Sequence, residues 1–209
     1  MNRKEFIQKS SMVAASTLLL PQLVSCSEES KYAIGLQLYT LRDSIPTAPK
    51  EVLNQVAALG YQELETYGYA DGKIFGLPFS EFIEYVNGLG MKTASGHYGL
   101  DQISGDTWKK AVEDAEKHNQ PFMVLPYLNA EDRTSIDDYK RICEQINKAG
   151  EVCNAAGLRM NYHNHDFELM PLAGEIPYDV MLSEIDPRNC GMEMDLYWVV
   201  RAGHDPITY

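Results

Sequence analysis

The chain has 209 residues, which is enough for one domain with a substantial buried core. Its formal net charge is −12 at pH 7, from 30 acidic and 18 basic residues. This charge repels phosphate backbones, so nucleic acid is not expected as a partner and polyphosphates are disfavoured as ligands.

The N-terminal segment has the pattern of an export signal and is left out of the fold. Arg3 and Lys4 form a positive head, an apolar run follows at 12–20, and Leu-Val-Ser stands directly before Cys26. Small residues before a cysteine are what a lipoprotein signal peptidase recognises, and the cysteine is then acylated. An ordinary signal peptide with an incidental cysteine is the alternative. A transmembrane anchor is not expected, because the apolar run is shorter than the ~20 residues that a bilayer span needs.

We therefore predict a lipoprotein signal peptide at 1–25, a tether at 26–31 and a folded domain at 32–209. The mature protein is expected in the periplasm or at the cell surface of a bacterium, held at the membrane only through lipid on Cys26. Residues 1–25 carry a net charge of +2, so their removal takes the chain from −12 to −14. Arg3-Lys4 stands where a twin-arginine signal has two arginines, which leaves both the Sec and the Tat export routes open.

Strand and helix patterns alternate through the folded domain. Strands are predicted at 33–39, 62–66, 91–97, 122–126, 158–163 and 191–195. Helices are predicted at 49–59, 78–89, 106–117, 135–156 and 178–185. Three glycines stand just past helix ends, where a left-handed residue is favoured: Gly60, Gly90 and Gly157.

Repeated βα units of this kind predict a parallel sheet, either open or closed into a barrel. No glycine-rich phosphate loop follows the first strand, which argues against a dinucleotide-binding fold. Polar residues collect at the carboxyl ends of many strands, as they do in a (β/α)8 barrel. Six strands in about 184 residues fall short of the about 250 that a complete barrel takes. The prediction is an α/β fold of the (β/α)8 TIM-barrel type, incomplete, with about six βα units and two open edges that favour oligomerisation.

Three cysteines remain besides Cys26. Cys143 and Cys153 fall in one predicted helix and are separated by roughly 15 Å along its axis. A disulfide needs Cα atoms within about 7 Å, so these two cannot pair within that helix. Cys190 lies at the start of the last strand. We expect three buried thiols and no disulfide framework.

Two strand ends carry the residue types that bind divalent metals. The run NYHNHDFE at 161–168 holds two imidazoles and carboxylates, and the run CGMEMD at 190–195 holds two more carboxylates. Imidazole nitrogen and carboxylate oxygen are common metal ligands, so the two strand ends together form a candidate cage for one ion. Side chains alternate along a strand, so one or two of these groups must support the others from outside the site.

These two runs, with IGLQLYTLR at 34–42, MDLYW at 194–198 and GHDP at 203–206, resemble the xylose-isomerase-like TIM-barrel superfamily (the sugar phosphate isomerase/epimerase family). The resemblance covers essentially residues 32–209. It implies an isomerase or lyase that abstracts a proton next to a carbonyl of a neutral sugar or keto-sugar, giving isomerisation, epimerisation or elimination. It also implies a divalent ion (Mn, Mg, Co or Zn) at the barrel mouth, which stabilises the enediolate. A non-catalytic partial barrel that binds sugar, or is a remnant, is the alternative.

The resemblance also implies roles for individual residues. It places Asp195 as a metal ligand at the end of the sixth strand. The fifth-strand ligand is open between His163 and Glu168, because the family usually has a glutamate where this chain has His163. Glu168, His163 and His165 are the predicted acid–base groups.

Four further residues are predicted on the substrate side: His97, Glu65, Trp198 and His204. For His97, a role as a strand-end polar residue without function has equal weight. The ring of Trp198 offers an apolar wall for the C–H face of a sugar. Glu193 lies two residues before Asp195 and is expected either on the same inward face or as a salt-bridged wall residue.

Lipidation of Cys26 is the first testable prediction. Metabolic labelling with a fatty-acid analogue is expected to mark the wild-type protein and to miss Cys26→Ala, because acylation needs that sulfur atom. Cys190→Ala serves as the control and keeps the label. Equal labelling of the wild type and Cys26→Ala would show that the N-terminus is not a lipoprotein signal.

Overall fold

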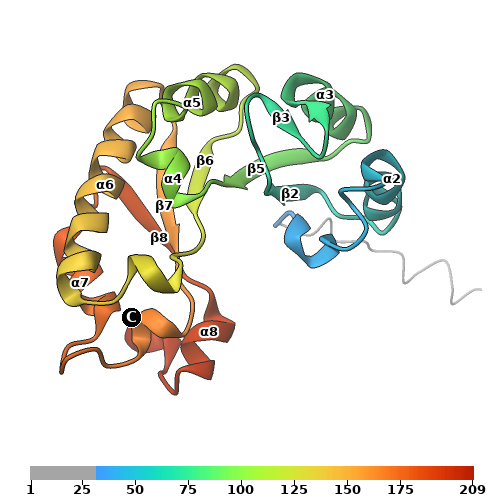
Figure 1. Cartoon of the computed structure of the whole chain (residues 1–209). Coiled ribbons are helices and arrows are strands. Elements are labelled where there is room, and N and C mark those ends of the chain that lie inside the picture. Colours follow the sequence, from blue (N-terminus) through green and yellow to red (C-terminus); the bar gives the residue numbers. More distant parts are fainter. Residues whose placement is uncertain (1–31) are drawn as a thin grey trace, which may run out of the picture. The chain divides into compact units, whose positions relative to one another are not determined.

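The architecture is a curved parallel β-sheet with helices packed on its outer face, seen in a computed structural model of the chain (Figure 1). The structure describes residues 32–209. Residues 34–209 form one unit, to which the following account applies. The predicted signal peptide (1–25) and tether (26–31), including Cys26, lie outside the described residues.

All six predicted strands are present in one sheet, in the order β1-β2-β5-β6-β7-β8, with every pair of neighbours parallel. Among the described residues β1 pairs only with β2, and β8 pairs only with β7, so the sheet is not closed. The predicted fold class, an incomplete TIM-barrel type with six βα units, is therefore confirmed. The strands are β1 (Gly35–Gln37), β2 (Glu63–Thr66), β5 (Lys92–His97), β6 (Phe122–Leu125), β7 (Arg159–His163) and β8 (Cys190–Glu193).

The helices follow the strands in alternation, and their ends carry the expected signals. Ser135 accepts a hydrogen bond from the Asp138 backbone N–H and caps the longest helix. Gly60 and Gly157 have φ of +89° and +72°, which confirms their predicted role in ending helices. The helices are α2 (Pro49–Ala58), α3 (Phe79–Gly88), α4 (Leu100–Ile103), α5 (Trp108–Lys117), α6 (Ile136–Ala155), α7 (Pro177–Glu184) and α8 (Leu196–Arg201).

Several elements differ from the sequence prediction. The first strand is shorter than 33–39, because the Gln37 side chain accepts the Tyr39 backbone N–H and starts the 3-10 helix Leu38–Leu41. A small antiparallel hairpin, β3 (Lys73–Ile74) and β4 (Leu77–Pro78), was not predicted. The last strand ends at Glu193, and Asp195 instead caps α8.

Side chains alternate across the sheet and give its two faces opposite character. Leu64, Met123, Met160 and Tyr162 are almost fully buried and belong to the main apolar core. That core also contains buried residues of α2, α3, α5 and α6. On β2, β7 and β8 the alternate positions carry polar groups such as Glu65, His163 and Glu193, whereas those of β6 are Phe122 and Val124. The helices thus cover the apolar face, and polar side chains from several strands gather on the concave face.

The three cysteines within the described part of the chain are free and buried, which confirms the predicted absence of a disulfide among them. No helix within residues 32–209 is both long and apolar enough to cross a membrane.

A second prediction concerns the contact between α6 and the loop before β8. A Cβ atom on Gly150 would lie 2.3 Å from the backbone oxygen of Asn189, so Gly150→Ala must push the helix and the loop apart. We expect this variant to lose about 1–3 kcal/mol of unfolding free energy, measured by chemical denaturation.

Gly88→Ala in α3 is the matched control, because nothing lies within 4 Å of the added Cβ. It should be neutral or stabilise by up to about 1 kcal/mol, since alanine favours helix. Equal stabilities for the two alanine variants would contradict the close packing at Gly150.

Candidate active site

A cleft of about 1120 Å³ opens at the carboxyl ends of the strands. Its lining residues come from the ends of β1, β2, β5, β6, β7 and β8 and from the start of α8. Residues far apart in sequence, such as Gln37, His97 and Trp198, therefore share one cavity. A site assembled from many strand ends is the arrangement typical of TIM-barrel proteins.

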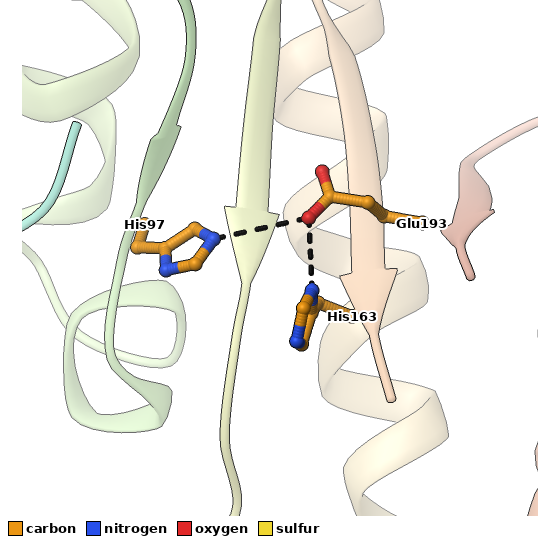
Figure 2. A group of neighbouring side chains, drawn as sticks. All are labelled: His97, His163 and Glu193. Atoms are coloured by element: carbon orange, nitrogen blue, oxygen red, sulfur yellow. Dashed lines mark hydrogen bonds and ion pairs between the residues drawn. The ribbon is translucent and has the colours of Figure 1, made fainter. Parts of the chain in front are cut away.

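The floor of the cleft is a cluster of His97, His163 and Glu193 (Figure 2). Glu193 Oε1 lies 2.9 Å from His163 Nδ1 and 3.9 Å from His97 Nε2. His97 ends β5 and Glu193 ends β8, so two strands separate them in the sheet. Three strand steps on a flat sheet would span about 14 Å. The two side chains meet only because the sheet curves around them.

His97 is surrounded by polar groups from β1 and β2. Gln37 Nε2 lies 3.2 Å from its Nδ1, and Glu65 Oε1 lies 2.8 Å from its Nε2. The second contact is close, yet its angle is not that of a hydrogen bond, and Nε2 is buried without a hydrogen-bond partner. Burial lowers the pKa of His97, but the contacts with Glu193 and Glu65 outweigh burial and raise it to about 9.

His163 stands between two carboxylates. Its Nδ1 contacts Glu193, and its Nε2 lies 3.6 Å from Asp195 Oδ2. Burial raises the pKa of Glu193, but its contacts with the His163 and His97 imidazoles outweigh burial and hold that pKa well below its usual range. Asp195 Oδ1 accepts the Tyr197 backbone N–H at 2.9 Å, so only its Oδ2 faces the imidazole.

His165 lies next to His163, within a group of aromatic rings. Its ring is 4.8 Å from Trp198 between centroids, is stacked on Phe167 and meets the edge of Tyr127. Its Nδ1 is buried and has no hydrogen-bond partner. Burial lowers the pKa of His165 to about 4, and the neighbouring His163 acts in the same direction. The imidazole is therefore neutral at neutral pH.

Glu168 lies below the cleft and does not line it. Its carboxylate is fully buried, accepts a hydrogen bond from the Tyr162 hydroxyl, and accepts the His165 backbone N–H at 2.9 Å. Burial raises its pKa to about 7, although the hydrogen bonds oppose this. Both oxygens are thus engaged in holding the loop that carries His165.

The structure brings together most of the residues predicted from the sequence, but not all of them. His204 donates to the Leu169 carbonyl oxygen at 3.0 Å and does not line the cleft. Glu168 is likewise outside the lining, and Cys26 lies outside the described residues. Six predicted residues do line the cleft: Glu65, His97, His163, His165, Asp195 and Trp198.

Several lining residues were not predicted as site residues, and three of them show what the sequence did and did not signal. Glu193 was expected either on the inward face or as a salt-bridged wall residue, with no role in the site, although its spacing from Asp195 was a usable signal. Tyr127 directly follows the fourth strand, and its position after Pro126 marked it as a strand-end residue. Gln102 lies in α4, whose single turn has no periodic signal.

No protein-family model and no curated protein sequence matches the chain. Among solved structures, a sugar phosphate isomerase/epimerase from Parabacteroides distasonis has a TM-score of 0.76 and 29% identity, covering 85% of this chain and 73% of the other. A second sugar phosphate isomerase/epimerase from that organism has a TM-score of 0.75 and 26% identity, covering 87% of this chain and 71% of the other.

A more distant likeness is to D-psicose 3-epimerase from Clostridium cellulolyticum, solved with D-tagatose. The TM-score is 0.61 with 14% identity, covering 81% of this chain and 65% of the other, so this likeness concerns the fold alone. The solved neighbours of this chain are sugar isomerases and epimerases, and its fold over most of its length is that of the xylose-isomerase-like TIM-barrel proteins, as its sequence motifs predicted.

Proposed function

We propose that this protein is an exported, lipid-anchored member of the sugar isomerase/epimerase type, which moves a proton next to the carbonyl of a neutral sugar or keto-sugar with the help of a divalent cation. The observation that carries the proposal is the cluster of His97, His163 and Glu193 on the floor of the cleft. The solved neighbours named as epimerases of D-psicose and L-ribulose support a small sugar as the substrate class. Export and lipid attachment rest on the sequence around Cys26.

The cluster fits a divalent cation on two grounds. Its candidate ligand atoms, two imidazole nitrogens and one carboxylate oxygen, lie within 4.8 Å of one another. Ligands that bind one metal at about 2.1 Å each lie roughly 3–4 Å apart, so the spacing is suitable. His97 Nε2 is buried and makes no hydrogen bond, and the groups that face it are carboxylates, Glu65 at 2.8 Å and Glu193 at 3.9 Å, whose negative charge also favours a cation. This donor set suits Zn, Co or Mn better than Ca.

His97, His163 and Glu193 would hold the cation in this arrangement. Asp195 remains a proposed ligand or partner of the site, because its Oδ2 is not used in capping α8 and faces the second nitrogen of His163. A carboxylate at that nitrogen is the usual partner of a metal-bound histidine. Glu168 is not assigned to the cation, because Tyr162 and the His165 backbone occupy its oxygens.

A bound divalent cation supplies polarisation of the carbonyl oxygen, which makes the neighbouring C–H more acidic. The chain itself must accept and return the proton, and His165 is proposed for this because it lines the cleft and is neutral, the form of imidazole that can accept a proton. The rings of Trp198 and Tyr127 exclude water on that side and offer apolar faces to the C–H groups of a sugar.

The charge of the cleft favours an unphosphorylated substrate. Three carboxylates line it, from Glu65, Glu193 and Asp195, and the described lining residues include no lysine or arginine. A phosphate group would need cationic partners at that surface. A neutral sugar or keto-sugar has no such requirement.

Cation binding is the third testable prediction. Isothermal titration with Mn²⁺ or Co²⁺ is expected to find one site per chain, and Glu193→Gln should weaken binding by at least about 100-fold because it removes the negative charge of the carboxylate that contacts both histidines. Glu63→Gln is the control: Glu63 is the first residue of β2, at the end away from the cleft, so this variant should bind the cation as the wild type does. Equal affinity for Glu193→Gln would remove this cluster as the cation site.

Proton transfer is the fourth testable prediction. Ketoses named for the solved neighbours, such as D-psicose, D-tagatose and L-ribulose, are incubated with the protein and Mn²⁺ in D₂O. NMR is expected to show deuterium at the carbon next to the carbonyl, and His165→Gln should slow this exchange by about 100-fold or more. Tyr197→Phe, outside the cleft lining, is the control.

The same experiment distinguishes the non-catalytic alternative. A protein that binds the cation and a sugar but exchanges no proton with any ketose would be a sugar-binding protein, and the catalytic proposal would be wrong. Exchange that persists unchanged in His165→Gln would leave the activity but remove His165 as the proton-moving group.

A further inference from the structure

The side chain of Asn164 occupies an unusual position between the two strand ends that build the site. It is fully buried. It directly follows His163, which forms the last pair of β7 and β8 with Glu193. Its Oδ1 accepts the Asp195 backbone N–H at 2.9 Å, and its Nδ2 lies 3.4 Å from the Asp195 carbonyl oxygen. The amide thus meets both backbone groups of Asp195, as another strand would.

This contact continues the ladder after the two main chains have stopped pairing. The pairing of β7 with β8 ends at His163 and Glu193, and α8 begins three residues later, at Leu196. Without a partner, the backbone of Asp195 would be free to turn at that point. The Asn164 amide supplies the missing partner from a side chain, so Asp195 stays in extended conformation (φ −84°, ψ 105°).

Two features of the cleft follow from the position of Asp195. Its Oδ2 faces His163 Nε2 at 3.6 Å, which orients the imidazole that contacts Glu193. Its Oδ1 accepts the backbone N–H groups of Tyr197 and Trp198 and so begins α8, which places the Trp198 ring against His165. One buried amide is therefore connected to both the proposed cation ligands and the aromatic wall.

We propose that Asn164 is a positioning residue for the cation site: its buried amide pairs with the backbone of Asp195 and thereby fixes Asp195 relative to His163. The inference rests on the proposed function, because it assigns the contact between Asn164 and Asp195 a role in cation binding in addition to its role in folding. It predicts that loss of the amide weakens cation binding more than its effect on folding explains.

The chain contains a matched control for this amide. Asn147 in α6 also braces a loop by two bonds, with Nδ2 donating to the Glu184 carbonyl oxygen at 3.0 Å and Oδ1 accepting the Asp186 N–H at 2.8 Å. It does not line the cleft and contacts no residue of the cluster. Its removal should therefore cost stability without changing the cation site.

The test compares Asn164→Ala, Asn164→Ser and Asn147→Ala in the full-length chain with Co²⁺ as the probe. Affinity is measured by titration, ligand geometry by the visible d–d spectrum of bound Co²⁺, and folding by the thermal midpoint. The Asn164 variants are expected to bind Co²⁺ about 10–100-fold more weakly, with an altered spectrum. Asn147→Ala should keep the wild-type affinity and spectrum even if its midpoint falls.

A measurement on the wild type keeps the proposal testable if the Asn164 variants do not fold. Hydrogen exchange of the Asp195 amide should be as slow as that of the β8 ladder amides, because that N–H is held by a buried acceptor. Fast exchange of this amide, or unchanged Co²⁺ affinity in the Asn164 variants, would overturn the inference alone. Failure of the wild type to bind Co²⁺ would overturn the proposed cation site as well.

Discussion

The alternation of side chains along a curved parallel sheet is the constraint on which the rest of this structure depends. One set of positions is apolar and packs against the helices in the main core. The side chains at the alternate positions must then point to the concave face, where they lie close to one another. Here they include Glu65, His97, His163 and Glu193, so stabilisation of the fold and assembly of the cleft are two results of the same pattern.

The arrangement also explains why the groups in the cleft have shifted proton affinities. Carboxylates and imidazoles from different strands are brought within a few ångströms in a partly buried space, where their mutual interactions are stronger than in water. The neighbouring carboxylates raise the pKa of His97, whereas burial among aromatic rings lowers the pKa of His165. Two imidazoles on one cleft are thereby given opposite properties by their surroundings.

Much of the fold could be predicted from the sequence because its signals are local. The six strands and the long helices follow from apolar periodicity, and the helix ends follow from Ser135 and the glycines. The hairpin of β3 and β4 could not be predicted, because strands of two residues are too short to show a period. The contact of His97 with Glu193 could not be predicted either, since it arises from curvature between strands that are not neighbours. For Glu168 the motif suggested a ligand, and only the three-dimensional structure reveals that Tyr162 and the His165 backbone take up its carboxylate.

The buried cysteines have a consequence for the chemistry of sulfur in this chain. Burial raises the pKa of Cys143, Cys153 and Cys190 to about 12 in each case. The thiolate is the form that attacks disulfides and reacts with oxidants, so at neutral pH these three sulfur atoms are almost entirely in their unreactive form. In the location outside the cytoplasm that we propose, conditions are oxidising, and a reactive free thiol would form disulfides there. In this protein the packing of α6 against the sheet buries the thiols of Cys143 and Cys153 in α6 and of Cys190 in β8. That burial keeps the three thiols protonated and slow to react without a disulfide partner.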